Sequence, residues 1–162
     1  MKTIIIYAST YGYTKECVER LKELINGETI LVNIKKEVVP SIEEFENIVI
    51  GGSIYMGQIL KKLKEYCSDN LNTLLNKRVA LFLCCGLPEK FEETIKNCFP
   101  EELLEKAIAK ECFGGELRTE KMNLAHKMIT GLMQRSSKPG SSETMGIPEN
   151  ITKLAEIINI RH

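Results

Sequence analysis

Short apolar runs alternate with amphipathic segments along this chain of 162 residues, and this alternation limits its possible folds more than any other feature. The apolar runs, at 3–8, 29–34, 47–52, 79–84 and, more weakly, 109–115, predict buried strands. Helical spacing of apolar residues predicts helices at 14–26, 58–75, 89–97, 101–107 and 148–160. Alternating strands and helices form parallel sheets with right-handed crossovers. We therefore expect one α/β domain over 1–162, with helices on both faces of a five-stranded parallel sheet of order 2-1-3-4-5.

Charge and composition argue against several functions. Lys and Arg total 22, as do Asp and Glu, so no excess of positive charge favours nucleic-acid binding. The first apolar stretch, residues 4–8, is too short for a signal peptide or a membrane span. We therefore expect a cytoplasmic protein that does not bind nucleic acid.

The six cysteines form no CxxC pair and have no metal-ligand spacing, and the chain has only two histidines. No metal site is expected. In a reducing compartment such cysteines are typically small buried hydrophobic residues. For the adjacent pair Cys84 and Cys85, a role in a binding site or in redox chemistry stays open as an alternative.

A loop rich in hydroxyl groups follows the first predicted strand, with the sequence Ser9-Thr10-Tyr11-Gly12-Tyr13-Thr14. In a parallel sheet of this order, ligands bind beyond the carboxyl ends of strands 1 and 3. Hydroxyl groups, a glycine and the amino end of a following helix are suited to a phosphate. The loop lacks a Walker lysine and a GxGxxG pattern, which disfavours nucleoside triphosphates and dinucleotides. The alternative is that its hydroxyl groups only cap the helix.

This loop resembles the flavodoxin phosphate motif, in which Ser9, Gly12 and Thr14 match and Tyr11 replaces the usual central threonine. The expected fold is thus flavodoxin-like. Within that family the chain is similar to the branch that contains the menaquinone-dependent protoporphyrinogen oxidases. The residues that carry this closer likeness are 51–57, Gly-Gly-Ser-Ile-Tyr-Met-Gly, and 113–118, Phe-Gly-Gly-Glu-Leu-Arg.

The resemblance implies flavin mononucleotide (FMN) as the cofactor, with its phosphate on residues 9–14. It places the flavin ring between two further loops, formed by Ser53, Ile54, Tyr55, Met56 and Gly57 on one side and by Cys85, Gly86 and Leu87 on the other. Tyr55 is expected to provide an aromatic face, and Gly57 a close turn of the backbone. The alternative for Tyr55 is an ordinary tyrosine in a turn.

About thirty residues separate the 113–118 patch from the last predicted helix, which is long for a connection in this fold. A mostly apolar helix is predicted at 123–134, followed by a surface loop at 134–146. The resemblance implies an element that faces substrate and membrane, so peripheral contact with the inner membrane face through 121–135 is one expectation. Packing of this helix on the edge of the sheet is the other. His126 is expected to be an incidental surface residue.

The resulting functional hypothesis is an FMN-dependent oxidoreductase, with a quinone, a porphyrinogen or a redox protein as its partner. No catalytic side chain is assigned, because flavin chemistry does not require one. The alternative is a non-enzymatic FMN electron carrier. A receiver-type signalling domain is excluded, because Ala8-Ser9 and Gly51-Gly52 stand where receivers need acidic residues.

Overall fold

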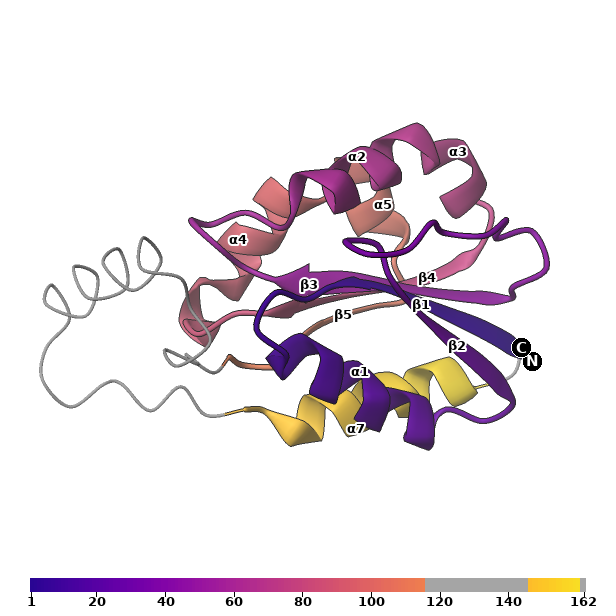
Figure 1. The fold of residues 1–162 in the computed structure, drawn as a ribbon, viewed down its shortest axis with the longest axis horizontal. Helices are drawn as coiled ribbons and strands as arrows, with labels where there is room; N and C mark the ends of the chain where they lie inside the picture. The colour runs from indigo at the N-terminus through magenta and orange to yellow at the C-terminus, as the bar shows by residue number, and fades with distance from the viewer. Residues whose placement is uncertain (116–145, 161–162) are drawn as a thin grey trace, which may run out of the picture.

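The computed structural model describes residues 1–115 and 146–160. Five parallel strands form one sheet in the order β2-β1-β3-β4-β5, so the predicted fold class and strand order are confirmed (Figure 1). The strands are β1 (Lys2–Ala8), β2 (Glu28–Asn33), β3 (Asn47–Ser53), β4 (Arg78–Cys84) and β5 (Ala109–Cys112).

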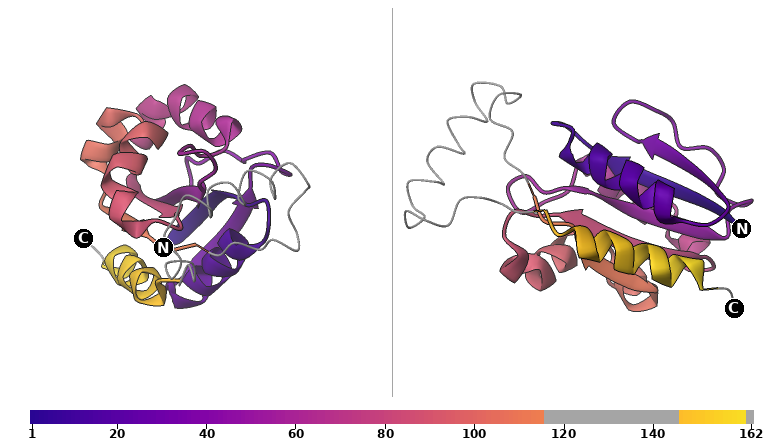
Figure 2. Two further views of the ribbon diagram at one scale, coloured as in Figure 1. Left: turned by 90° about the vertical axis from the view of Figure 1, so that its left-hand side faces the viewer. Right: turned by 90° about the horizontal axis from the view of Figure 1, so that it is seen from below.

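Helices cover both faces of the sheet. On one face, α1 (Tyr13–Leu24) and α7 (Pro148–Asn159) lie side by side, as the view from below shows (Figure 2). The opposite face carries the other helices of the described residues, which are α2 (Lys61–Asp69), α3 (Leu71–Leu74), the 3₁₀ turn η1 (Pro88–Lys90), α4 (Phe91–Cys98) and α5 (Glu101–Lys106). The result is a three-layer sandwich.

The strands are apolar on both sides because helices bury both faces. Successive side chains of a strand point to opposite faces, so Ile4 and Ile6 pack beneath α2 while Ile5 packs against α1. On the α1 side the rings of Phe82 and Phe113 stack, with centroids 4.7 Å apart. All six cysteines are buried and reduced, which confirms the prediction that they are small core residues.

The predicted bounds of the helix over 58–75 were wrong. Gln58 bridges back to Tyr55 in a short hairpin, so the helix begins only at Lys61. It ends at Asp69, since Asn70 leaves the helical conformation with φ of −107° and ψ of 15°. The backbone and side-chain amides of Asn70 both donate to the Tyr66 carbonyl oxygen, at 3.1 and 3.0 Å, and a separate turn, α3, follows.

The end of α1 also differs from the predicted helix over 14–26, which would continue up to Gly27. The helix ends at Leu24, and Ile25 turns extended and buries its side chain. The side-chain amide of Asn159 in α7 donates to the Leu24 carbonyl at 2.9 Å, and its oxygen accepts from the Asn26 amide at 2.8 Å. A tertiary cap therefore ends α1. Gly27, with φ of 91°, serves the turn into β2.

Smaller differences concern the last strand and the segment after it. β5 ends at Cys112 rather than at residue 115, because Gly114 takes a positive φ of 72°. The helix predicted at 123–134, the loop predicted at 134–146 and the membrane contact predicted for 121–135 lie essentially outside the described residues. Among the residues that the structure describes, no helix is long and apolar enough to cross a membrane.

Candidate functional site

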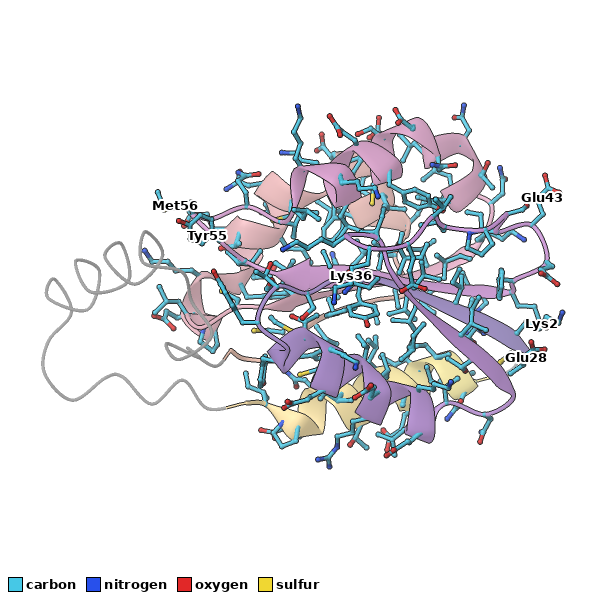
Figure 3. The ribbon with its side chains drawn as sticks, in the orientation of Figure 1. Lys2, Glu28, Lys36, Glu43, Tyr55 and Met56 are labelled. Carbon is cyan, nitrogen blue, oxygen red and sulfur yellow. The ribbon has the colours of Figure 1, made fainter. Side chains whose placement is uncertain are left out.

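Parallel pairing brings the predicted site loops to one edge of the sheet. Ala8 at the end of β1 pairs with Gly52, and Ser53 at the end of β3 pairs with Cys84. The loops 9–14, 53–57 and 85–87 therefore leave the sheet as neighbours. Figure 3 shows Tyr55 and Met56 at this carboxyl edge, at the opposite end of the sheet from Lys2 and Glu28.

The loop 9–14 leads directly into the amino end of α1. Gly12 precedes the helix with φ of 102°, a left-handed conformation that favours glycine, and its carbonyl accepts from the Glu16 amide at 3.1 Å. The first amides of a helix have no partner within it. Together with the helix dipole, these amides favour an anion at this end of α1. The Ser9 side chain is buried beside them, while Thr10 is exposed.

Two predicted loop residues point inward instead. The Tyr13 hydroxyl donates to the Phe113 carbonyl at 2.6 Å, tying α1 to the end of β5, and burial raises the pKa of this phenol. Thr14 is almost fully buried, close to the Cys84 thiol, whose pKa is raised mainly by burial. In this conformation the backbone amides of both residues, rather than their polar side-chain groups, lie at the helix end.

The loop after β3 forms a tight hairpin. Tyr55 and Gln58 exchange two backbone hydrogen bonds, of 2.9 and 3.1 Å, around Met56 and Gly57. Both central residues have positive φ, 53° for Met56 and 73° for Gly57, as in a type I′ turn. The Tyr55 side chain is 42% exposed and that of Met56 is 66% exposed. The hairpin thus presents the Tyr55 ring and the Met56 side chain from a hydrogen-bonded turn.

The loop after β4 lies against the end of β5. The thiol of Cys85 is buried and donates to the Leu87 carbonyl at 3.4 Å, so this side chain belongs to the core and not to the open edge. A Cβ on Gly115 would come within 2.8 Å of the Gly86 backbone nitrogen, which shows how closely the two loops approach. Leu87 is 47% exposed. Gly86 and Leu87 therefore form the accessible part of this loop.

Lys35 is a site residue that the sequence reasoning missed. It follows β2, and its Nζ lies 3.4 Å from the Thr10 hydroxyl oxygen. The loop 9–14 itself contains no charged residue, so this lysine brings a positive charge to the predicted phosphate site from another strand. The predicted strand order could have indicated Lys35, because it places the end of β2 beside the end of β1.

Two shallow depressions lie elsewhere on the described surface. One, of about 480 Å³, runs along α1 and is lined by Glu16, Glu19, Arg20, Glu23 and Leu24. The other, of about 250 Å³, lies between residues 39–43 and the α2–α3 region. Neither brings together the predicted site loops. We place the candidate site at the carboxyl edge because the open amides and the hydroxyl groups converge there. No group of side chains suited to a metal ion occurs within 1–115 and 146–160.

Comparison with solved structures supports the fold. Oxidised flavodoxin 2 from Bacillus cereus is 20% identical, with 98% of this chain and 97% of that chain covered and a TM-score of 0.60. The flavodiiron core of Flv1 from Synechocystis sp. PCC6803 is 13% identical, with 98% of this chain but 36% of that chain covered and a TM-score of 0.54. A search of curated proteins gave no match.

The family follows from the sequence model that matches the chain. This model describes a flavodoxin domain and matches residues 4–144, which includes all three predicted site loops and most of the chain. The strand order and the placement of the loops agree with that match. The chain belongs to the flavodoxin domain family.

Proposed function

We propose that this chain binds one FMN at the carboxyl edge of its sheet and transfers electrons through it. The observation that carries the proposal is the loop 9–14, which joins β1 to the open amino end of α1 through a left-handed Gly12. Bound FMN supplies reversible transfer of one or two electrons. The protein binds and orients the cofactor and controls its surroundings.

The groups at the loop fit a phosphate monoester. The amides at the start of α1 and the hydroxyl groups of Ser9 and Thr10 are all donors, and the loop contains no carboxylate. Lys35 adds a cationic donor at its rim. Glu16, the acidic residue in the first turn of α1, lines the depression along the outer side of that helix.

The two neighbouring loops fit the flavin ring. The 55–58 hairpin offers the exposed Tyr55 and Met56, and the loop after β4 offers Gly86 and Leu87. Exposed apolar groups on a folded protein favour contact with an apolar ligand face. Backbone groups of these loops can hydrogen-bond to the edge of the ring and tune its reduction potential.

Two modes of electron transfer follow from different observations. Gly114 bridges to Gly146, so described backbone from two distant parts of the chain meets at the edge that carries the site. This closure of the edge favours our leading proposal, an oxidoreductase related to the protoporphyrinogen oxidase branch that acts on a small substrate. The exposed apolar side chains of Tyr55, Met56 and Leu87 favour the alternative, a carrier whose partner protein covers the flavin edge.

Cofactor binding is tested by titrating the apoprotein with FMN and following the quenching of flavin fluorescence. We expect tight 1:1 binding, and we expect Gly12→Val to abolish most of it because valine disfavours the left-handed conformation. Thr10→Ala should weaken binding by about 1 kcal/mol through the lost hydroxyl donor. The matched control is Thr73→Ala, an exposed threonine of α3. Absence of FMN binding at micromolar concentration would overturn the proposal.

The two modes are separated with the FMN-loaded protein under anaerobic conditions. Rapid bleaching by protoporphyrinogen, followed by reoxidation with a menaquinone analogue, supports the oxidoreductase. Reduction by a flavodoxin reductase alone, with no response to porphyrinogen or quinone, supports the carrier and rejects the leading proposal.

A further inference from the structure

Lys35 connects the turn after β2 with the candidate phosphate loop. We propose that Lys35 makes the site selective for a phosphorylated flavin over an unphosphorylated one, by placing an ammonium group beside the phosphate. This inference rests on the proposed function and adds a specificity residue to it. The supporting contact is the 3.4 Å approach of Lys35 Nζ to the Thr10 hydroxyl oxygen.

Hydrogen bonds within the turn after β2 hold the backbone of Lys35 in place. The Asn33 side-chain oxygen accepts from the Lys35 amide at 3.2 Å, and the Asn33 carbonyl accepts from the Lys36 and Glu37 amides at 2.8 and 2.9 Å. The Ile34 amide donates to the Tyr7 carbonyl of β1 at 2.9 Å, which ties the turn to the strand that leads into the phosphate loop. The turn therefore fixes the backbone from which the Lys35 side chain extends toward Thr10.

The charge of Lys35 is available to a ligand. Within the described part of the chain, Lys35 forms no ion pair, whereas Lys2, Lys15, Lys61 and Lys153 each pair with a carboxylate. The carboxylate in the same turn, that of Glu37, accepts from the Asn33 amide at 3.1 Å. A phosphate with two negative charges would therefore face an uncompensated ammonium group.

Thr10 would pass the influence of the Lys35 charge on to the bound phosphate through its hydroxyl group. Because its oxygen accepts from Lys35, its own hydroxyl proton is left to be donated. A hydroxyl group that accepts a charged hydrogen bond becomes a stronger donor, since neighbouring hydrogen bonds polarise one another. Lys35 and Thr10 would thus act together on the phosphate. Neither would contact the ring, so the gain should be confined to the phosphorylated ligand.

The test compares FMN and riboflavin as ligands of the apoprotein. We expect Lys35→Gln to raise the Kd for FMN by about 3- to 30-fold, the range between an exposed ion pair and a charged hydrogen bond. In Lys35→Gln the Kd for riboflavin should stay unchanged, and FMN binding should depend less on salt than in the wild-type protein. Lys35→Arg keeps the positive charge and should keep most of the FMN affinity.

The matched control is Lys36→Gln, which removes the same charge from the next residue. Lys36 is exposed (Figure 3), and in the turn its backbone amide donates to the Asn33 carbonyl. An equal loss for Lys36→Gln would indicate general attraction and overturn the inference, as would an unchanged FMN affinity in Lys35→Gln. An equal loss for both ligands in Lys35→Gln would also overturn it. If the wild-type protein binds neither flavin, the proposed function fails, whereas FMN binding without any effect of Lys35 rejects only this inference.

Discussion

The two ends of the same sheet are built from different kinds of residue. At the amino end, Lys2 pairs with Glu44 at 2.8 Å and with Glu28 at 3.9 Å, and the amino terminus pairs with Glu46 at 3.5 Å. At the carboxyl end, the loops 9–14, 53–57 and 85–87 contain no charged residue and are rich in glycine and hydroxyl groups. One end is tied by charged side chains, and the other leaves backbone donors and apolar side chains accessible.

The two ends contribute differently to stability and to ligand binding. The exposed ion pairs at the amino end hold neighbouring segments together, each with a small contribution. Within the described residues, the carboxyl end contains three glycines and one methionine with positive φ, namely Gly12, Gly57, Gly114 and Met56, and an open helix start, whereas the amino end contains only Gly27. Backbone geometry of this kind costs stability and is common where ligands bind. We therefore expect substitutions at the amino end to change stability without changing FMN affinity, whereas the carboxyl end serves both packing and binding.

The largest effect is expected for Gly51→Ala, near the carboxyl end of β3. A Cβ at this position would clash with the Phe82 backbone and lie about 2.5 Å from its ring, so we expect a loss of about 3 kcal/mol or more in unfolding free energy. Urea denaturation measures it. Gly57→Ala is the control, because a Cβ there meets no atom within 4 Å and only its positive φ is unfavourable, at a cost of about 1 kcal/mol. Equal losses in the two variants would contradict the packing explanation.

Alkaline pH should destabilise the carboxyl end through Cys84. Burial raises the pKa of this thiol above its ordinary value, so the unfolded chain loses the proton first as the pH rises. Its contribution to stability is therefore complete below about pH 9 and is lost above it. Cys84→Ala should show a shallower decline of unfolding free energy above pH 9 than the wild-type protein. An identical pH slope in both proteins would rule out this assignment.

A medium effect is expected for Asn159→Ala, next to the amino end. The variant loses the two hydrogen bonds that close the end of α1, so we expect a loss of about 1 to 2 kcal/mol. Thermal and urea unfolding measure this change, and FMN affinity should be unaltered. Asn72→Ala, at an exposed position of α3, provides a control for the loss of an asparagine side chain. A change in FMN affinity for Asn159→Ala would weaken the separation between the two ends.

The smallest effect is expected for Lys2→Met. Exposed ion pairs contribute little to stability, and salt screens them. We expect a loss of unfolding free energy smaller than that of Asn159→Ala, which shrinks at high salt, without any change in FMN binding. A loss as large as that of Gly51→Ala would show that the charged residues at the amino end control the stability of the sheet.

Much of the fold could be predicted because strand patterns are local. Apolar runs such as 3–8 and 79–84 can only be buried on both faces, and the alternation with helical segments then implies parallel pairing. Helix ends were less predictable. The end of α1 depends on Asn159, which lies more than 130 residues away in the chain, and no local pattern shows such a partner.

For the candidate site, the sequence by itself determined the loops and their place at the carboxyl ends of the strands, because residue type and strand order suffice for that. Only the tertiary structure decided the direction of individual side chains. Tyr13 turns inward to Phe113, Cys85 joins the core and Lys35 reaches Thr10 from another strand. These directions result from packing between segments that are distant in sequence, so a reading of neighbouring residues cannot predict them.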